Sequence, residues 1–403
     1  MSSLKLLYVA PCYAPAWAFG GVVTAASNLC SELAKREVNV TVYCTNLDGK
    51  GSTLDVPVNE KVKRNGVDIF YHPCTAMCSR AFYSRSLSDR IARSVEEFDI
   101  VHVSALWQYH QVSVYLACRK HGIPYIFSPH SSLMRWAFED LGNTFYKKMY
   151  WYCLARRTVA NASRIRFLSQ GEAITSQKWT PNESAVVIPN GIDVNKYMST
   201  QSPSRGAEKI MKSKDVKVTT DDRDVLLHLG RVTPKKNIHL ILDAFSESIK
   251  VRDKFTFICI GSKDDRTYFE RIKKMAPYDF ENVVFLSTVD HKKVYEWYNA
   301  ADLLVLPSEI EGVSMTVIEA LSSRLPVLVS NRVANYTEIE EYRAGIVVKP
   351  ELRSLIDGLL EFSKLPSSRK ESLKTNAARL AKSEYAIDNV ANRMQEELRN
   401  IVG

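Results

Sequence analysis

Short apolar runs rich in β-branched and aromatic residues recur along the whole chain, and helical patterns separate most of them. The runs of the first half are Leu4–Ala10, Val38–Thr45, Val67–Tyr71, Ile100–Ser104, Tyr125–Ser128, Ile165–Ser169 and Ala185–Ile188. Those of the second half are Val225–Leu229, Phe255–Ile260, Val283–Leu286, Leu303–Leu306, Val327–Ser330 and Ile346–Val348. Continuous apolar runs are typical of strands buried on both faces, and their alternation with helices indicates parallel βαβ units. The sequence therefore predicts an α/β fold.

The chain has 403 residues, which suggests two or three domains at roughly 100–200 residues each. Between the two series of runs, Met198–Asp224 is rich in Ser, Thr, Lys and Asp and has little apolar periodicity. We interpret it as a linker region with flanking turns. The prediction is two tandem doubly wound, Rossmann-like domains over residues 1–197 and 198–384. Such sheets bind ligands at the carboxyl ends of their strands, so we expect the domains to face a cleft.

Positive charge is concentrated in the first half of the chain. Residues 1–200 hold 22 Lys and Arg against 15 Asp and Glu, whereas the remainder holds 32 against 30. The segment Met134–Thr158 combines aromatic residues with Lys147, Lys148, Arg156 and Arg157. Basic residues among aromatics suit an anionic membrane surface. The alternative is that the aromatics pack into the first domain while the charges face water.

The cysteines and the hydropathy pattern favour a cytoplasmic protein. Of eight cysteines, only Cys74 and Cys78 lie close together, and no pair of histidines accompanies them, so we expect reduced thiols rather than a zinc site. No apolar run reaches 18 residues, and the first residues do not form a secretory signal. The predicted location is cytoplasmic, with peripheral association at the inner face of the cell membrane if the basic aromatic segment binds lipid.

A glycine pair follows the first predicted strand. Gly20-Gly21 lies in a loop of Pro and Ala residues and opens the helix predicted over Val22–Lys35. Glycines at a helix N-terminus allow backbone N–H groups to approach a phosphate, although a plain tight turn would give the same sequence. The spacing G-x-G-x-x-G is absent, which argues against a nicotinamide enzyme.

A basic loop follows the first strand of the second half, with the sequence His228-Leu229-Gly230-Arg231-Val232-Thr233-Pro234-Lys235-Lys236-Asn237. The predicted strand ends at Gly230 and a helix starts near Asn237. Arg231 is suited to bidentate phosphate binding, and Lys236 adds a charge beside the helix N-terminus. The context favours an anion site over a solvated loop.

A pair of glutamates follows the strand Leu303–Leu306. Glu311 lies in the loop and Glu319 about one turn into the next helix, so both can reach one ligand. Carboxylates so placed can accept paired hydrogen bonds from vicinal hydroxyls of a sugar or ribose. The intervening Gly312–Ser314 can offer backbone N–H groups. The neighbours of Glu319 are apolar, and a carboxylate in that setting usually has a partner.

Together, these motifs resemble the retaining nucleotide-sugar glycosyltransferases of the GT-B fold, the large family with a Glu-x7-Glu motif that includes enzymes of cell-surface polysaccharide synthesis. Further stretches that agree with the family are Asp99-Ile100-Val101-His102, Ser128-Pro129-His130-Ser131-Ser132-Leu133-Met134 and Pro189-Asn190-Gly191-Ile192-Asp193. The resemblance covers nearly the whole chain. It implies an acceptor-binding first domain and a nucleotide-sugar-binding second domain.

The resemblance also implies roles for individual residues. Arg231 and Lys236 would neutralise the donor diphosphate, Glu319 would bind the ribose, and Glu311 would bind the donor sugar. The sugar and phosphate site would be lined by the backbone of Gly312, Val313 and Ser314. From the first domain, Gly20 and Gly21 would flank the diphosphate and His130 would lie near the anomeric carbon. The catalytic set is then His130, Glu311, Arg231 and Lys236.

Other positions receive narrower expectations. Trp107 and His110 follow the strand Ile100–Ser104 and are candidates to shape the acceptor site. His102, within that strand, is an acceptor-site candidate or a buried core residue. Glu338, in the segment that follows the strand Val327–Ser330, is a further candidate that the cleft could reach. No metal or other cofactor is expected, because positive side chains and a helix N-terminus can neutralise a diphosphate; Asp221-Asp222 and Asp264-Asp265 read as solvated turns.

Some positions depart from the family pattern. Arg324 stands where the family usually has glycine, so either Arg324 adopts a left-handed conformation or the turn differs. Val313 replaces an aromatic residue and Ser287 a common glycine. These changes affect the identity of the sugar and the base rather than the class of reaction.

The C-terminal segment is predicted to form an amphipathic helix. Ile387, Val390, Met394 and Leu398 recur at three- and four-residue spacing, which forms one helical stripe. The GT-B resemblance implies that this helix, at about residues 385–403, crosses back to the first domain.

The leading functional hypothesis is transfer of a hexose from a UDP- or GDP-sugar to a glycan or lipid-linked saccharide. A sugar-nucleotide epimerase or a glycan phosphorylase on the same fold is the alternative reaction. A basic nucleic-acid-binding protein is the alternative of another class, but the near-neutral second half and the absence of an RNP or helix-turn-helix signature argue against nucleic acid as a partner. The sequence does not specify the base, the sugar, the acceptor or the linkage.

Overall fold

The computed structural model describes residues 3–49, 51–74, 82–136, 144–198, 223–263, 265–275, 282–290 and 293–403. The chain divides into two compact units. Unit 1 comprises Met1–Ile192 and Ile387–Gly403, and unit 2 comprises Asp193–Ala386. The boundary predicted at residue 197 lies a few residues after this division. Most of the expected linker lies outside the described residues, as do Cys78, Phe138, Asp221-Asp222 and Asp264.

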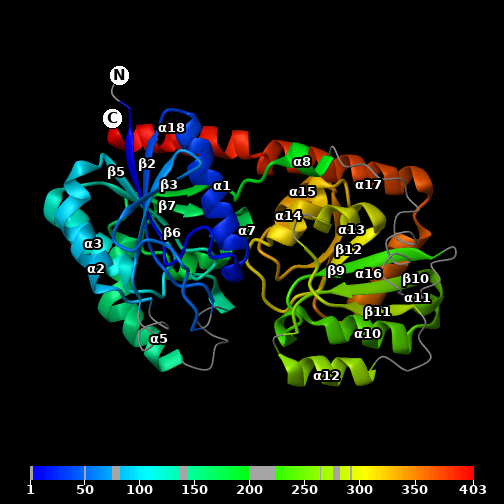
Figure 1. The fold of residues 1–403 in the computed structure, drawn as a ribbon. Helices are drawn as coiled ribbons and strands as arrows, with labels where there is room; N and C mark the ends of the chain where they lie inside the picture. The colour runs from blue at the N-terminus through cyan, green and yellow to red at the C-terminus, as the bar shows by residue number, and fades with distance from the viewer. Residues whose placement is uncertain are drawn as a thin grey trace. The chain divides into compact units, whose positions relative to one another are not determined.

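Unit 1 contains an eight-stranded sheet with the order β3-β4-β2-β1-β5-β6-β7-β8 (Figure 1). Its strands are β1 Lys5–Val9, β2 Asn39–Thr45, β3 Lys61–Arg64, β4 Val67–His72, β5 Ile100–Ser104, β6 Tyr125–Ser128, β7 Arg164–Phe167 and β8 Ala185–Val187. All neighbouring strands pair in parallel except β3, which pairs antiparallel to β4. The carboxyl ends of the parallel strands therefore share one edge of the sheet.

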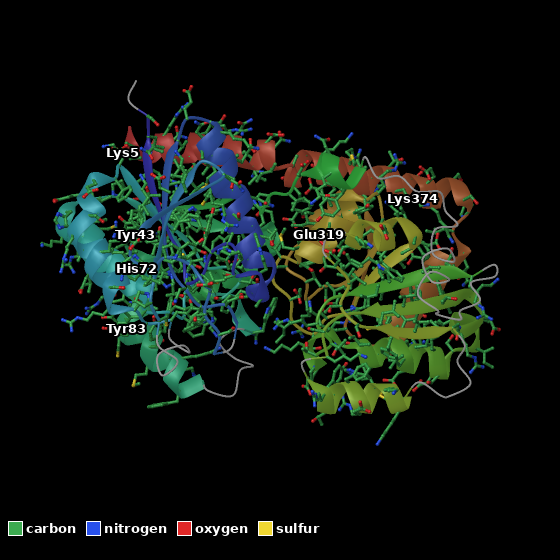
Figure 2. The ribbon with its side chains drawn as sticks, viewed as in Figure 1. Lys5, Tyr43, His72, Tyr83, Glu319 and Lys374 are labelled. Carbon is green, nitrogen blue, oxygen red and sulfur yellow. The ribbon has the colours of Figure 1, made fainter. Side chains whose placement is uncertain are left out.

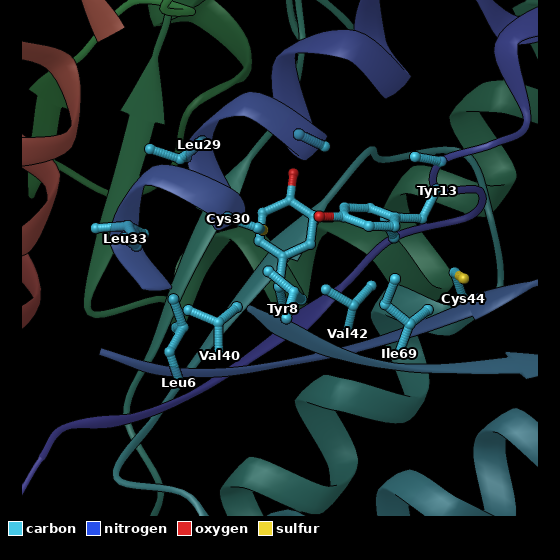
Figure 3. Packing of buried hydrophobic residues seen from close by; sticks show 14 of the residues in the cluster. Leu6, Tyr8, Tyr13, Leu29, Cys30, Leu33, Val40, Val42, Cys44 and Ile69 are labelled. Carbon is cyan, nitrogen blue, oxygen red and sulfur yellow. The ribbon is translucent and has the colours of Figure 1, made fainter. Parts of the chain in front are cut away.

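Helices cover both faces of this sheet. They are α1 Gly21–Lys35, α2 Arg85–Ser94, α3 His110–His121, α5 Thr144–Tyr150, α6 Arg156–Ala160, α7 Gln170–Ser176 and α18 Ile387–Val402, with a π-helical turn Trp151–Ala155 between α5 and α6. One buried cluster joins the sheet to α1 and α18, and Figure 3 shows its centre, where Tyr8 and Tyr13 meet Cys30 of α1. A second cluster joins the opposite face to α2 and α3. Two apolar faces explain the continuous apolar runs in the strands.

The C-terminal helix α18 packs on unit 1, as predicted. Val390, Met394 and Leu398 are fully buried in the same cluster as the residues of α1. Arg36, which follows α1, pairs with Asp388 at 3.0 Å. Figure 1 shows α18 beside α1, although hundreds of residues separate them in the sequence. The predicted apolar stripe is therefore the surface that the helix buries.

Unit 2 contains a six-stranded parallel sheet with the order β11-β10-β9-β12-β13-β14. The strands are β9 Asp224–Leu229, β10 Phe255–Ile260, β11 Val283–Leu286, β12 Leu303–Leu306, β13 Val327–Ser330 and β14 Gly345–Val348. The helices are α8 Val194–Met198, α10 Ile238–Glu247, α11 Ile249–Lys254, α12 Arg266–Met275, α13 Val294–Ala300, α14 Met315–Ser322, α15 Tyr336–Tyr342, α16 Leu352–Lys364 and α17 Ser367–Leu380, and a π-helical turn Ala381–Tyr385 follows α17. The strand order changes direction between β9 and β12, so the loops after these strands lie at a switch point, where such sheets bind ligands.

The predicted fold class is confirmed, because each unit is a doubly wound parallel sheet. The sequence missed β3, whose residues Lys61–Arg64 are mostly charged and form a sheet edge. The question about Arg324 is resolved: its φ is +63°, so this arginine adopts the left-handed conformation where glycine is usual. Such a conformation costs a non-glycine residue roughly 1–2 kcal/mol.

Candidate active site

The loop after β9 is held against the loop after β10. Gly230 donates its N–H to the Ile260 carbonyl at 2.9 Å, and Val232 donates to the Ser262 carbonyl at 2.9 Å. A Cβ atom at Gly261 would lie 1.6 Å from the Gly230 carbonyl oxygen, so only glycine fits there. Close backbone approach therefore fixes the position from which Arg231 projects.

Lys236 and Glu311 form an ion pair within unit 2. The Lys236 Nζ lies 2.5 Å from Glu311 Oε2, and both side chains are about four-fifths buried, with 15% and 21% exposed. A backbone hydrogen bond from Glu309 to the Lys235 carbonyl at 2.8 Å joins the two loops, and Glu311 donates to the carbonyl of Arg332, after β13, at 3.2 Å. Two residues that lie 75 positions apart in the sequence therefore meet at the switch point of the sheet.

Glu319 lies on the first turns of α14 and is half-buried (labelled in Figure 2). The Tyr298 hydroxyl donates a hydrogen bond to its Oε2 at 2.8 Å. Burial, together with the nearby Glu319 carboxylate, raises the pKa of Tyr298 and of Tyr197, so both phenols stay protonated near neutral pH. The expectation that this carboxylate has a partner is confirmed by Tyr298.

The segment between the two glutamates offers backbone donors. Among the described residues, no backbone carbonyl accepts a hydrogen bond from the N–H of Gly312, Val313 or Ser314. Ser314 is the N-cap residue of α14, so these N–H groups lie at a helix N-terminus, where partial positive charge favours anions. Arg231, in the loop after β9, is exposed, and the described part of the chain shows no ion pair for it.

Of the site residues predicted in unit 1, Trp107 and His110 follow β5, and His130 follows β6. The Ser104 hydroxyl and His130 Nε2 are 2.7 Å apart, so the end of β5 holds the imidazole that follows β6. His130 and Ser131 both have positive φ, +48° and +64°. Burial lowers the pKa of His130 to about 3, with a further contribution from the Arg166 charge, so its ring is neutral near pH 7.

The sequence analysis missed two buried charged residues, of which Glu172 holds this loop and Arg166 holds the segment after β8. Glu172 is fully buried and accepts hydrogen bonds from the Ser131 N–H at 2.5 Å and the Leu168 N–H at 2.8 Å. Arg166 is 2% exposed and donates to the carbonyls of Ile188 and Pro189 at 2.9 and 2.6 Å. Burial raises the pKa of Glu172 to about 7, against the effect of its two backbone donors.

A signal for Glu172 was present in the sequence. Ser169-Gln170-Gly171-Glu172 has the spacing of a capping box, and the Ser169 hydroxyl does accept from the Glu172 N–H at 3.0 Å. The Glu172 carboxylate, however, accepts hydrogen bonds from the backbone N–H groups of Leu168 and Ser131. That tertiary contact is not encoded in the local spacing. Arg166 alternates with apolar residues inside β7, where no local pattern marks it.

The proposed acceptor residues differ in their accessibility. His102 is fully buried, contacts the Ser128 hydroxyl at 2.7 Å and packs edge-on against Tyr8, which favours the core alternative stated for it. His110 is 2% exposed and its Nε2 lies 2.7 Å from the Ser104 carbonyl. Trp107 is partly exposed, with Lys147 Nζ 5.2 Å from its ring centre.

The glycine pair and Glu338 occupy ordinary local positions. Gly20 has φ of +69° and caps α1, and Gly21 is the first residue of that helix. The left-handed backbone at residue 20 explains why glycine stands there. Glu338 lies on α15 and accepts a hydrogen bond from the Thr337 hydroxyl at 2.8 Å.

Within the described ranges, no group of three or more His, Cys, Asp or Glu side chains is arranged to hold a metal ion. A search of the same residues found no helix that is both long and apolar enough to cross a membrane.

Family models match both units of the chain. The model described as Glycosyltransferase Family 4 matches residues 19–196, and the model described as Glycosyl transferases group 1 matches residues 210–380. These matches agree with the two doubly wound sheets and with the motifs at their strand ends. The chain belongs to the retaining nucleotide-sugar glycosyltransferases of the GT-B fold.

Individual relatives cover most of the chain at low identity. An uncharacterized glycosyltransferase of Methanocaldococcus jannaschii is 26% identical over 349 residues, which are 84% of this chain and 85% of the relative. An alpha-monoglucosyldiacylglycerol synthase of Streptococcus pneumoniae is 24% identical over 328 residues, 76% of this chain and 67% of the relative. The crystal structure of Anabaena HepE in complex with UDP has a TM-score of 0.75 at 18% identity and covers 98% of this chain and 100% of that one. The structural likeness shows the fold.

Proposed function

We propose that this enzyme transfers a hexosyl group from a UDP-sugar to a lipid-linked saccharide or glycan, with retention of the anomeric configuration. The observation that carries the proposal is the Lys236–Glu311 pair at the switch point of unit 2, beside the N-terminus of α14. UDP is the favoured nucleotide of the donor because the structurally similar HepE was crystallised with UDP. The lipid-linked acceptor is favoured because the pneumococcal relative is named as a glycolipid synthase.

In this proposal, unit 2 binds the donor. Lys236 and Arg231 neutralise the diphosphate, and the N–H groups of Gly312, Val313 and Ser314 donate to its oxygens or to the sugar. Glu319, held by Tyr298, accepts hydrogen bonds from the ribose hydroxyls. Departure of the nucleoside diphosphate concentrates negative charge on oxygen, and fixed positive groups stabilise that charge most in the transition state.

The ion pair of Lys236 and Glu311 is proposed to hold the donor site ready. Without donor, each charge neutralises the other at 2.5 Å. A bound diphosphate offers Lys236 a second anionic partner, which leaves Glu311 oxygens available to the sugar hydroxyls. Neither partner then becomes a buried charge without a counter-charge, which would be costly.

Unit 1 is proposed to serve the acceptor side of the reaction. His130 is neutral near pH 7, so it can exchange hydrogen bonds with hydroxyl groups without adding charge near an oxocarbenium-like centre. Ser104 fixes the ring through Nε2 at 2.7 Å, leaving Nδ1 as the buried atom without a hydrogen-bond partner. Gly20 and Gly21 flank the diphosphate, with the Gly20 N–H donated to the Trp17 carbonyl at 2.9 Å, and Trp107 and His110 shape the acceptor site.

The proposal is tested with a panel of nucleotide sugars. Thermal shift identifies the donor, release of the nucleoside diphosphate measures turnover, and NMR of the product reports the anomeric configuration. We expect a UDP-hexose to stabilise the protein and to release UDP when acceptor is present. Epimerised donor without release of UDP would instead indicate an epimerase, and phosphate-dependent cleavage of a glycan would indicate a phosphorylase.

We further propose that unit 1 docks on anionic membrane through the segment from α5 to α6. Phe145, Met149 and Tyr152 are 73%, 50% and 63% exposed, and their spacing places them on one helical face. Exposed basic residues flank this face, namely Lys148, Arg156 and Arg157. Other aromatics of the segment pack inward: Trp151 is buried, and the Tyr150 hydroxyl bonds the Gln108 carbonyl at 2.9 Å. The exposed residues are the ones that suit an acyl boundary and anionic headgroups.

Liposome co-sedimentation tests the docking. Wild type is expected to sediment with anionic vesicles at low salt, and Lys147→Glu with Lys148→Glu is expected to stay in the supernatant. A matched control is Lys63→Glu with Lys120→Glu, which reverses two exposed charges elsewhere in unit 1. Wild type that remains in the supernatant with anionic vesicles would contradict membrane docking and favour a soluble glycan acceptor. Equal sedimentation of all three proteins would place the surface elsewhere.

A further inference from the structure

A cavity of about 670 Å³ lies within unit 1, between helix α2 and the strands β2, β3 and β4. None of the residues proposed above for donor or acceptor binding lines it. It extends from Lys5, at the start of β1, to His72, at the end of β4, and Figure 2 labels both residues together with Tyr43 between them. The cavity is therefore a feature of one unit and is separate from the candidate active site.

The strand residues that face this cavity form a polar floor. Asn39, Thr41 and Tyr43 alternate along β2, so they share one face of the sheet. The register pairs Thr41 with Asp68 and Tyr43 with Phe70, which puts the β4 residues on that face too. A sheet face that is buried by helices is normally apolar, whereas this end of the sheet is open, with Asn39 exposed and Thr41 and Asp68 partly exposed.

Helix α2 supplies the wall of the cavity. Ser86, Arg90 and Arg93 lie four and three residues apart, which places them on one helical face, and all three line the cavity. Leu87 and Ile91 of the same helix are buried in the core. The helix thus presents its apolar side to the core and its charged side to the cavity.

Arg90 is held rigidly but lacks a carboxylate partner. Its guanidinium carbon lies 3.6 Å from the centre of the Phe70 ring and 5.3 Å from that of Tyr43. Its Nε is buried and has no hydrogen-bond partner, and the described residues show no ion pair for this side chain. Its Nη1 donates to the Asn59 carbonyl at 3.5 Å. Stacking on an aromatic face leaves Nε and the remaining N–H groups able to donate in the plane of the guanidinium. A buried donor without an acceptor is unfavourable, so the site is suited to a ligand oxygen.

His72 presents a second buried atom without a partner. The residue is 1% exposed, and its Nδ1 lies 2.9 Å from Asn59 Oδ1 and 3.2 Å from the Ser86 hydroxyl. Burial, with the Arg90 charge, lowers the pKa of His72 to about 4, so the ring is neutral near pH 7. A neutral ring that donates through Nδ1 to the amide oxygen of Asn59 presents Nε2 as an acceptor. That Nε2 is buried and has no hydrogen-bond partner.

The charges around the cavity favour an anion. Lys61 is paired with Asp68 at 2.5 Å, which removes one charge of each sign. Asp89, also in the lining, lies 3.8 Å from Arg85. The remaining charged residues of the lining are the cations Lys5, Arg90 and Arg93 and the anion Glu97. A ligand with negative charge would thus be drawn to this cavity.

We propose that this cavity binds an acidic saccharide, a sugar ring that carries a carboxylate or a phosphate group. Its oxyanion accepts from Arg90, and one of its ring hydroxyls donates to His72 Nε2. The hydroxyl and amide groups of Ser86, Ser94 and Asn59 meet further ring hydroxyls. The volume is far larger than one oxyanion needs and lies in the usual range for small-molecule sites. A free sugar acid or sugar phosphate and an acidic unit of a polysaccharide have the same chemistry here.

The test is a titration of the 403-residue chain without donor, followed by calorimetry or ligand-observed NMR. The probes are glucuronic acid, glucose 6-phosphate, a tetrasaccharide that contains glucuronic acid, glucose and inorganic phosphate. We expect the acidic sugars to bind about tenfold or more tightly than glucose or phosphate, because each partner group adds a charge-assisted or hydroxyl hydrogen bond. Tighter binding of the tetrasaccharide than of glucuronic acid supports a polymer source, and the reverse supports a free sugar. Phosphate that binds as tightly as every acidic sugar, or no binding of any acidic sugar at millimolar concentration, overturns the proposal.

Variants locate the binding. Arg93→Glu, at an exposed residue of the lining, should weaken acidic sugars about tenfold or more. Lys63→Glu, an equal charge reversal at an exposed residue of β3 outside the lining, should leave affinity unchanged. Arg90→Gln should abolish binding, and if that variant does not fold, Arg93→Glu decides. Equal losses in Arg93→Glu and Lys63→Glu would show that binding follows net charge rather than this cavity. Because no donor is present, the result is independent of the proposed transfer reaction.

Discussion

The two units share an architecture but differ in whether their candidate site residues are charged. In unit 2, the candidate donor side chains are charged groups on loops and helix starts: Lys236 pairs with Glu311, Glu319 accepts from Tyr298, and Arg231 is exposed. In unit 1, the corresponding strand ends carry imidazoles in the interior. His102, His110 and His130 all have their pKa lowered by burial, so they are neutral near pH 7.

The difference follows from what each unit is proposed to bind. A diphosphate needs cations in place before it arrives, and unit 2 supplies an exposed one in Arg231 and a largely buried one in Lys236, whose charge is countered by Glu311. A hydroxyl acceptor needs oriented hydrogen-bond partners, and buried neutral rings hold their orientation through a fixed network. Unit 1 also has two buried charged residues, Arg166 and Glu172. Their hydrogen bonds go to backbone groups rather than to a ligand.

The largest effect is expected at Glu172. Burial chiefly raises the pKa of Glu172 in the folded protein to about 7, from its ordinary value of 4.5. A group with a raised folded pKa contributes stability at low pH that is lost as the pH rises through the folded pKa. Relative to Glu172→Gln, which does not titrate, wild type should therefore lose on the order of 3 kcal/mol of unfolding free energy between about pH 4.5 and pH 7.

Hydrogen exchange of peptides from β6 and β7 in both proteins, corrected for the intrinsic pH dependence of exchange, measures this difference. A difference in protection that grows in favour of wild type with rising pH would mean that the Ser131 and Leu168 N–H groups outweigh burial. The contrast between neutral buried groups in unit 1 and charged groups in unit 2 would then not hold for Glu172. A matched control is Glu183→Gln, at an exposed residue of the same unit.

The next effect tests unit 2. Lys236→Ala and Glu319→Ala should each lower kcat/KM roughly 10–150-fold, the loss expected for one charge-assisted contact of about 1.5–3 kcal/mol. Lys235→Ala and Glu309→Ala are the matched controls, because these residues lie close to Lys236 and Glu311 in the sequence and are not assigned to the donor. Near-wild-type kcat/KM in both Lys236→Ala and Glu319→Ala would refute the donor assignment.

The sequence predicted unit 2 more sharply than unit 1, for a physical reason. Charged residues in loops must be explained by solvent or ligand, so Arg231, Lys236 and Glu311 stand out in the chain, and their spacing relative to strands and helices is local. The strands themselves were readable because continuous β-branched runs need two buried faces. The C-terminal stripe of Val390, Met394 and Leu398 predicted an amphipathic helix, and the family resemblance supplied its destination.

What the sequence could not supply depends on contacts between distant segments. Glu172 reads as a capping residue, and only the fold brings it to Ser131, which lies 41 positions earlier. Arg166 lies inside strand β7. The alternation of side chains along a strand does not show that Arg166 donates to the carbonyls of Ile188 and Pro189. Strand β3 has a charged sequence because an edge strand faces water on one side, so no apolar run marked it.

A smaller effect is expected at His130. Replacement by Gln removes the imidazole but keeps a hydrogen-bonding group, so kcat/KM should fall about 2–12-fold, the range for one neutral hydrogen bond of about 0.5–1.5 kcal/mol. His121→Gln, at the end of α3, is the control and should match wild type. A loss beyond a hundredfold would show that His130 carries a proton or charge in the reaction, and unit 1 would then resemble unit 2 in its use of charge.

The smallest expected effect is that of metal removal, where we predict none. In unit 2, Lys236, Arg231 and the N-terminus of α14 together offer the diphosphate two cations and a partial positive charge, so the leaving group is neutralised without a divalent ion. Transfer rates measured before and after exhaustive EDTA treatment should therefore agree, and added Mg²⁺ or Mn²⁺ should not raise them. Complete loss that only a divalent ion restores would contradict this. The cations of unit 2 would then not be enough to neutralise the diphosphate. A divalent ion would have to be added to the assignment of positive groups to unit 2 and neutral groups to unit 1. The control is Lys236→Ala: if the lysine performs the role that a metal would otherwise fill, Mg²⁺ should recover part of the lost rate in this variant but leave wild type unchanged.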